Sequence, residues 1–333
     1  MLLRKISSTP TLLRRCVQWG FLLWCLYLGS QFALFVRHFE TGGAAPRYVR
    51  PPGVEAFLPI GSLVSLKNWL VNGLFDPVHP AALVLFLTFS LLCLLARKSF
   101  CSWLCPLGTF SELLWRLGRR LRPEELRVPK LLDTLLMLPK YLLLFFFAKV
   151  ILWDMPPMAA RLFLESPYWA VSDVKMLHFF TGISGTALFV VAVLCLLSVF
   201  LKNFWCRYLC PYGAWLGLFS LLSPAHIRRD EAVCTGCGAC SRACPSRIAV
   251  AQKKRVLSAE CTGCLGCVQR CPEPGALAMR WATLRFSGFH FALTVLAVFA
   301  IGVGAGMLSG HWQSSLGYGD FQRLILLAPR LSH

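Results

Sequence analysis

The chain has 333 residues, 56% of them hydrophobic, and a mean hydropathy of +0.61, which excludes an ordinary soluble domain of this size. We therefore expect an integral membrane protein. Its 34 Lys and Arg residues outnumber its 15 Asp and Glu residues and give a net charge of +19. This excess does not predict a nucleic-acid partner, because the basic residues lie beside apolar segments, where they orient a chain in the membrane.

Five apolar segments follow one another along the chain, and about twenty apolar residues suffice to cross a bilayer. We predict a membrane α-helical bundle whose five transmembrane helices span residues 17–36, 81–97, 130–153, 181–201 and 287–308. Prolines, glycines and polar residues interrupt the apolar part of the first long loop. This loop, residues 37–80, is therefore expected to contain an interfacial or re-entrant helix.

The basic residues are distributed unequally between the predicted loops. We assign residues 1–16, 98–129 and 202–286 to the cytoplasm, and residues 37–80, 154–180 and 309–333 to the outer side. Counted with the residues that flank each helix, the cytoplasmic segments hold 24 of the 34 Lys and Arg residues and the outer segments hold 8. Cytoplasmic loops are typically enriched in these residues. The prediction is a multi-pass protein of the bacterial inner (cytoplasmic) membrane, with its N-terminus inside and its C-terminus outside.

A doubled cysteine motif lies in the segment 225–286. Each copy reads C-x-x-C-x-x-C-x-x-x-C-P; in such runs the first three thiolates bind one [4Fe–4S] cluster and the fourth binds the other cluster. The set predicted to hold the first cluster is Cys234, Cys237, Cys240 and Cys271. The set predicted to hold the second cluster is Cys261, Cys264, Cys267 and Cys244.

This motif predicts an inserted cytoplasmic α+β ferredoxin domain of the bacterial 2[4Fe–4S] type. Four glycines are expected to let the two cysteine loops fold tightly, since glycine adopts positive φ readily; they are Gly236, Gly238, Gly263 and Gly266. A disulfide framework and zinc knuckles are the alternatives. The doubled spacing of eight cysteines disfavours both.

A second pattern, C-x-x-x-C-P followed by a glycine, occurs at the predicted cytoplasmic ends of two membrane helices. Its first copy contains Cys101 and Cys105 in the loop 98–129, and its second contains Cys206 and Cys210 in the segment 202–224. Residues four apart share a helix face, and four thiolates complete a cluster. We therefore predict a third iron–sulfur centre held by both copies. Redox-active thiol pairs and plain helix packing are the alternatives.

The other four cysteines lie in or beside apolar stretches without partners in the sequence; they are Cys16, Cys25, Cys93 and Cys195. We interpret them as small packing residues.

Polar residues just before the second and fourth helices, at their predicted outer ends, are candidates for a quinol site: Asp76, His79, Asp173 and His178. Carboxylates and imidazoles in this position accept protons near neutral pH when tuned by their surroundings. Glu55 and Lys67, in the interrupted apolar part of the loop 37–80, are further candidates. The alternative is that polar residues simply gather where helices leave the lipid.

With both cysteine patterns in view, the chain resembles the NapH/MauN-type membrane polyferredoxins, which include the 4Fe–4S membrane quinol dehydrogenase subunit associated with periplasmic nitrate reductase. The resemblance covers about residues 85–281 and is carried by the two helix-end motifs and the eight ferredoxin cysteines. It implies quinol-linked electron transfer by an electron-transfer subunit of an oxidoreductase. The implied partners are the membrane lipid and quinone pool, and a redox protein, either a periplasmic cytochrome or iron–sulfur subunit or a cytoplasmic donor.

Two features limit how far the resemblance extends. The typical nitrate-reductase subunit resembles four crossings followed by the ferredoxin, whereas this chain adds a fifth apolar segment and a tail. The sequence contains neither C-x-x-C-H, which would attach a c-type haem, nor G-x-G-x-x-G, which would bind a dinucleotide, so the terminal partner is expected to be another protein. A membrane reductase that serves the maturation or assembly of another metalloenzyme, and a redox sensor, are the alternative functions.

Overall fold

A computed structural model describes residues 10–121 and 128–331. Part of three predicted segments therefore lies outside the described residues, namely 1–9 of the amino-terminal segment, 122–127 of the loop 98–129, and 332–333 of the tail. The chain divides into two structural units. The first contains residues 1–22, 89–144 and 192–300, and the second contains residues 23–88, 145–191 and 301–333.

Proline sets the beginning of many helices in this chain. Among the described residues, seven α-helices begin at a proline: α2, α3, α4, α6, α8, α9 and α12. The first turn of a helix needs no backbone N–H from its first residue, and the fixed φ of proline already suits the helix. The prolines that interrupt the sequence pattern thus mark where new helices start.

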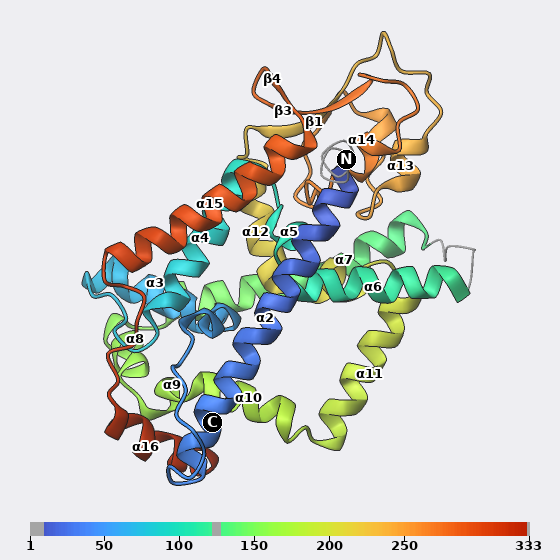
Figure 1. Cartoon of the computed structure of the whole chain (residues 1–333). Helices are drawn as coiled ribbons and strands as arrows, with labels where there is room; N and C mark the ends of the chain where they lie inside the picture. Colours follow the sequence, from blue (N-terminus) through green and yellow to red (C-terminus); the bar gives the residue numbers. More distant parts are fainter. Residues whose placement is uncertain (1–9, 122–127, 332–333) are drawn as a thin grey trace. The chain divides into compact units, whose positions relative to one another are not determined.

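The five apolar segments of the sequence form the helices α2 (Pro10–Glu40), α4 (Pro80–Ala96), α7 (Lys130–Ala148), α11 (Gly185–Phe200) and α15 (Gly288–Leu308), shown in Figure 1. The π-helix η2 (Lys149–Asp154) continues α7. The divisions between the two units fall inside these five helices.

By length and composition, the described residues contain three helices that can cross a membrane, at α2, at Leu131–Asp154 and at α15. Helix α10 (Ser172–Thr181) and α11 count as a fourth only if taken together, and they are bent by 80° at Gly182 to Ser184. Helix α4 has 17 residues, about 25 Å, which is less than the hydrocarbon core of a bilayer. The structure thus supports three or four spans, and the predicted number of five is not confirmed.

The first unit carries the two helix-end segments and the predicted ferredoxin domain. Its remaining helices are α5 (Phe100–Trp103), α6 (Pro106–Leu121), η3 (Trp205–Leu209), α12 (Pro211–Leu221), α13 (Ala239–Ala243), η4 (Val250–Gln252) and α14 (Gly266–Gln269). Helix α6 contains the motif glycine Gly108 and carries Arg119 and Arg120 in its last turn, where the partial negative charge of a helix C-terminus favours basic residues.

An antiparallel sheet completes the predicted α+β domain, next to the short helices α13 and α14 (Figure 1). The strands β1 (Ala225–Arg229), β2 (Arg255–Val256), β3 (Leu277–Trp281) and β4 (Leu284–Phe286) lie in the order β2-β1-β3-β4. Ile227 of β1 pairs with both Val256 and Met279, and all three side chains are buried. This apolar face forms the core on which the cysteine loops are built.

The second unit consists of the remaining helices: η1 (Pro52–Phe57), α3 (Pro59–Asn72), α8 (Pro157–Leu164), α9 (Pro167–Ala170), α10, α16 (Tyr318–Leu327) and η5 (Ala328–Arg330). Part of α2 shares its apolar core with α10 and α16, through Phe35, Val174 and Ile325 among others. Helix α3 passes Trp169 so closely that a Cβ at Gly61 would lie 2.0 Å from the indole ring. Glycine is therefore required at this crossing.

Candidate functional site

The first helix-end segment begins where α4 stops. Arg97 adopts a positive φ of 58°, which turns the chain out of α4 and into α5. Cys101 lies in α5, and Cys105 immediately precedes Pro106, the first residue of α6. A Cβ at Gly108 would lie 2.2 Å from the carbonyl oxygen of Cys101, so the motif glycine lets the two cysteine-bearing turns approach each other.

The second segment repeats this plan after α11. Asn203 adopts a φ of 53°, Cys206 lies in η3, and Cys210 is the N-cap of α12. The backbone N–H of Gly213 donates to the Cys210 sulfur at 3.2 Å. A thiolate in this position is stabilised by the free N–H groups and the dipole at the helix N-terminus.

The four helix-end cysteines, two from each segment, influence one another's ionisation. Burial, opposed by the Lys98 ammonium but reinforced by the Cys105 and Cys210 thiolates, raises the pKa of Cys101 to about 12. Burial and the thiolates of Cys105, Cys210 and Cys101 likewise raise the pKa of Cys206 well above its ordinary value. The structure therefore brings the four predicted residues into one neighbourhood.

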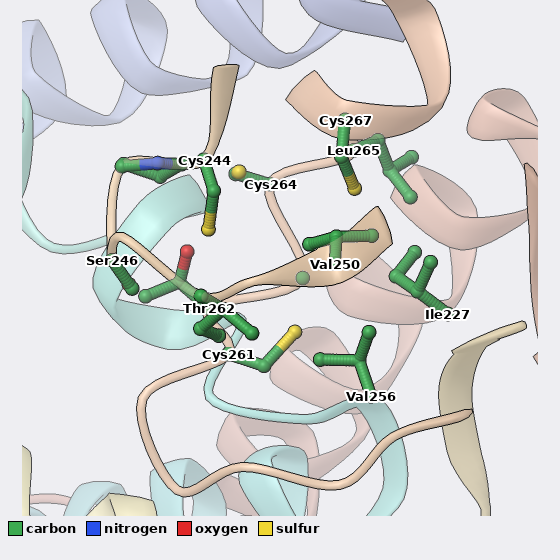
Figure 2. A pocket seen from close by; sticks show the side chains of 13 residues that line it. Ile227, Cys244, Ser246, Val250, Val256, Cys261, Thr262, Cys264, Leu265 and Cys267 are labelled. Atoms are coloured by element: carbon green, nitrogen blue, oxygen red, sulfur yellow. The ribbon is translucent and has the colours of Figure 1, made fainter. Parts of the chain in front are cut away.

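The second predicted ferredoxin set surrounds a cavity, and Figure 2 shows its sulfur atoms turned toward the enclosed space. The four cysteines in the lining are Cys244, Cys261, Cys264 and Cys267. Ile227, Val250, Val256 and Leu265 complete much of the wall, which shields the thiols from water (Figure 2). A desolvated thiolate site of this kind suits a cluster whose potential depends on exposure and hydrogen bonding.

The first predicted ferredoxin set lies nearer to solvent. Burial and the thiolates of Cys240, Cys237 and Cys234 raise the pKa of Cys271, against a lowering contact with the Glu273 backbone. These four residues are thus neighbours. Cys237 is exposed, and the Gly236 N–H and the Arg229 guanidinium lower the pKa of the solvent-accessible Cys234 thiol.

The two cysteine loops achieve their tight turns with different residues. Gly236 and Gly238 both have φ of 71° in the first loop, and Gly263 has φ of 60° in the second, as predicted for these glycines. Gly266 does not have a positive φ; the corresponding turn is made by Leu265, at φ of 60°. Leu265 is only 3% exposed, so burial of its side chain compensates for the backbone strain.

The cysteine donors suit iron–sulfur clusters. All sixteen cysteines lie in the described part of the chain and none forms a disulfide. Among the described residues, no three His, Cys, Asp or Glu side chains converge on the position of a single metal ion. A cluster core is larger than one ion, so four cysteines spaced around a cavity suit it.

A buried charged group beside the cysteines was not anticipated from the sequence. Glu260 accepts hydrogen bonds from Lys140 at 2.6 Å and Tyr141 at 2.9 Å, and the Lys98 ammonium lies 3.7 Å away. Burial alone would raise the pKa of Glu260, but the two ammonium groups hold it below its ordinary value. Spacing along the sequence carries no signal for this group, since Lys140 and Glu260 are 120 residues apart.

Three of the six quinol-site candidates meet around Arg50, which sequence reasoning also missed. The guanidinium of Arg50 donates to Glu55 at 2.7 Å, to Asp173 at 2.7 Å and to Nδ1 of His79 at 3.0 Å. All four side chains are at most 8% exposed. Burial alone would lower the pKa of Arg50, but the carboxylates of Asp173 and Glu55 raise it above its usual value.

His79 lies between an acceptor and a donor, and its Nδ1 is also 3.4 Å from the Glu55 carboxylate. Its Nε2 lies 2.9 Å from the carbonyl oxygen of Trp169, which can only accept, and its Nδ1 faces Arg50, which can only donate. The neutral imidazole with a proton on Nε2 satisfies both contacts. We call Arg50, Glu55, His79 and Asp173 the Arg50 group.

The other three candidates do not join this group. Asp76 accepts from Ser65 and from the Trp169 indole, and it accepts from the Val78 N–H in the turn that precedes α4. Lys67 donates to backbone carbonyls at the end of η2, including that of Ile151 at 2.9 Å. The Lys67 contacts are those of helix C-terminal capping, and the Asp76 contacts are those of a buried turn.

His178 lies at the surface of the second unit, away from the Arg50 group. It forms an ion pair with Glu40 at 2.8 Å, and both side chains are partly exposed. An exposed pair of this kind is weakly stabilising.

Comparison with protein families assigns both cysteine patterns to iron–sulfur domains. The model of a 4Fe–4S binding domain matches residues 78–123 and 183–229, which contain the two helix-end segments. The model of a 4Fe–4S dicluster domain matches residues 226–272, which contain the doubled motif.

Known relatives agree with this assignment. The Escherichia coli (strain K12) protein YccM, described provisionally as an electron transport protein, is 42% identical over 327 residues, covering 96% of this chain and 91% of YccM. The methylamine utilization ferredoxin-type protein MauN of Methylorubrum extorquens is 29% identical over 154 residues, 44% of this chain and 47% of MauN. The regulatory protein NosR of Pseudomonas aeruginosa is 32% identical over 170 residues, 47% of this chain and 21% of NosR.

No solved structure is significantly similar to this chain. The match to YccM over nearly the whole chain, together with the matches to two iron–sulfur domain models, nevertheless shows the protein family of this chain. The chain belongs to the NapH/MauN-type family of polyferredoxin 4Fe–4S membrane proteins.

Proposed function

We propose that this protein is the membrane subunit that exchanges electrons between the quinone pool and a partner redox protein. The observation that carries the proposal is the gathering of twelve cysteines, in three sets of four, within the first unit. Such sets bind [4Fe–4S] clusters, which supply one-electron carriers when bound. Electron carriers in a membrane protein of this family are well suited to a lipid-soluble donor.

The ligand sets of the proposal follow the sequence motif. Cys234, Cys237, Cys240 and Cys271 hold the first ferredoxin cluster. Cys244, Cys261, Cys264 and Cys267 hold the second. Cys101, Cys105, Cys206 and Cys210 hold a third centre between the helix-end segments, which is supported by the mutual effects on their pKa values and by the 4Fe–4S family match.

Oxidation of a quinol releases two protons along with two electrons, so a quinol site needs proton acceptors. We assign this role to Glu55 and His79 of the Arg50 group. Nδ1 of His79 takes up a proton once the Arg50 guanidinium turns to its carboxylate partners, which it already contacts at 2.7 Å. Asp173 keeps Arg50 in place during this exchange.

The proposed orientation places the ferredoxin domain in the cytoplasm and the Arg50 group near the outer side. It is supported by the excess of Lys and Arg in segments 97–130 and 202–286. A cytoplasmic location also suits the twelve cysteines of the proposed ligand sets, because thiols stay reduced there.

The test is anaerobic mixing of the purified protein with a reduced quinol analogue while the visible absorption of the clusters is recorded. We expect bleaching by quinol, and slower bleaching in the variants Glu55→Gln and His79→Gln at unchanged iron content. Lys149→Gln, which removes an exposed lysine paired with Asp154, is the control. A protein that dithionite bleaches but quinol does not would refute the quinone link.

The second candidate function is a reductase that serves the maturation of another metalloenzyme. NosR, one of the relatives, is described as a regulatory protein and not as an electron-transfer subunit, so a role other than steady electron transfer is worth testing. Deleting the gene distinguishes the two: a maturation factor leaves electron flux through an already assembled enzyme intact, whereas an electron-transfer subunit does not.

A further inference from the structure

The first helix-end segment binds one particular loop of the ferredoxin domain. The Ser102 hydroxyl donates to the carbonyl oxygen of Thr262 at 2.6 Å, and the Trp103 indole N–H donates to that of Gly263 at 3.2 Å. Trp103 is fully buried and Ser102 is 8% exposed. Hydrogen bonds sheltered from water in this way hold two segments in a fixed relation.

These four residues all lie between proposed cluster ligands in the sequence. Ser102 and Trp103 lie inside Cys101–Cys105, the cysteine pair of the first helix-end segment, and Thr262 and Gly263 lie inside Cys261–Cys264 of the second ferredoxin set. Each hydrogen bond therefore joins a side chain that lies between two proposed ligands of one centre to the backbone between two proposed ligands of the other.

Further contacts reinforce the same junction. The guanidinium of Arg97 donates to the carbonyls of Ser220 and Val256, and the Lys98 ammonium faces Glu260, the residue before Cys261. Arg97 is fully buried and Lys98 is 3% exposed. The junction thus consists of buried charged and polar side chains. Burying such side chains is costly unless each has a specific partner.

The loop of the first ferredoxin set has different surroundings. Thr235, Gly236 and Cys237 are exposed, and the carbonyl of Cys237 accepts from the exposed Arg242 within the same domain at 3.0 Å. This loop faces solvent, where another protein can approach it.

We infer that the second ferredoxin set is the direct electron-exchange neighbour of the helix-end centre. Ser102 and Trp103 are the positioning residues of this step. The first set is the point at which electrons are exchanged with the partner protein. The inference rests on the proposed function. In the direction of quinol oxidation, one electron leaves the centre at the helix ends, which is oxidised, and one electron is gained at the second set, which is reduced; no bond forms or breaks.

Spin–spin interaction in electron paramagnetic resonance tests the order, because the signal of a reduced centre is broadened by a second reduced centre nearby. With the full chain, we expect Cys264→Ala to remove the broadening of the helix-end signal and Cys237→Ala to leave it. The reverse pattern would overturn the inference.

A second variant keeps all ligands in place, in case Cys264→Ala does not fold. Trp103→Phe removes the indole donor, and after mixing with a quinol analogue we expect slower reduction of the second set at unchanged iron content. Trp215→Phe is the matched control, because the Trp215 indole donates to Ser90 on α4 rather than to the ferredoxin loop. Equal rates in Trp103→Phe and Trp215→Phe would overturn the positioning role.

The outcomes separate this inference from the proposed function. A missing helix-end signal in the unmodified protein would refute the third centre and the inference together. A helix-end signal that quinol cannot reduce would refute the quinone link alone, since the broadening pattern can be recorded with dithionite as the reductant.

Discussion

The two helix-end segments are copies of one sequence pattern, yet they bind different neighbours. In the first copy, Ser102 and Trp103 contact the ferredoxin loop. In the second, Arg207 and Tyr208 both bind the carboxylate of Asp133 on α7. Duplication thus supplied cysteines in equivalent pairs, while the intervening residues diverged so that one copy holds the ferredoxin and the other holds a membrane helix.

The largest expected effect is on the iron content, and it is the same for both helix-end segments. Cys101→Ser and Cys206→Ser should each abolish the helix-end centre and lower the iron content by about four per chain, because each copy supplies two of its four ligands. Iron and acid-labile sulfide analysis measures this, with Cys16→Ser as the control. Unchanged iron in both variants would show that the copies do not share a centre.

The next largest effect is on stability, and it is expected for α6, which follows the first helix-end segment, but not for α12, which follows the second. Glu112 of α6 binds Arg14 at 2.8 Å and Gln18 at 3.1 Å, whereas α12 contains no charged residue. Burial opposes ionisation of Glu112, but hydrogen bonds and charge from Arg14 lower its pKa from 4.5 to about 2. Its contribution to stability, at most about 3 kcal/mol, is present above pH 4.5 and is lost as the pH falls toward 2.

Glu112→Gln should therefore lower the thermal stability at neutral pH and flatten its decline below pH 4.5. Unfolding in detergent between pH 7 and pH 3 measures this. An unchanged acid profile would mean that the Arg14 contact is not made.

A smaller difference is expected at the motif glycines. Gly108→Ala would place a methyl group 2.2 Å from the Cys101 carbonyl and should destabilise the protein by about 1–3 kcal/mol. Gly213→Ala meets only ordinary contacts, the nearest at 3.5 Å, and should be neutral or slightly stabilising. Thermal unfolding of the two variants measures this difference. Equal losses of stability in both would argue against the close approach of Gly108 to Cys101.

The smallest effect concerns charge near the first copy. Removing the Lys98 ammonium should make the helix-end centre harder to reduce, with a negative shift on the order of tens of millivolts, because the reduced form carries one more negative charge. Redox titration of Lys98→Gln measures the shift, and Lys149→Gln serves as the control. A shift to more positive potential would contradict the proposed position of Lys98.

Much of the first unit follows from the sequence, because cysteine spacing is a local property. The cysteines that the motif groups together are also neighbours in the structure, and the strands flanking them form the expected α+β domain. Contacts between distant residues carry no such signal. Nothing in the spacing indicates that Lys140 meets Glu260, or that the guanidinium of Arg50 lies between Glu55 and Asp173.

Local conformation also escaped sequence reasoning at several points. A leucine at positive φ is unfavourable in isolation, and only its burial in the ferredoxin core explains Leu265. The predicted span 181–201 begins within a bend of 80°, since the chain leaves the helical path at Gly182. Hydropathy averages over a window and does not register such breaks.

An anaerobic redox titration followed by electron paramagnetic resonance, with and without a quinol analogue, tests both the third centre and the quinone link. We expect three centres in the unmodified protein, with quinol reducing the one held by the helix-end cysteines. Two low-potential clusters that remain oxidised in the presence of quinol would contradict the proposed function and would favour a reductase that receives its electrons from a cytoplasmic donor.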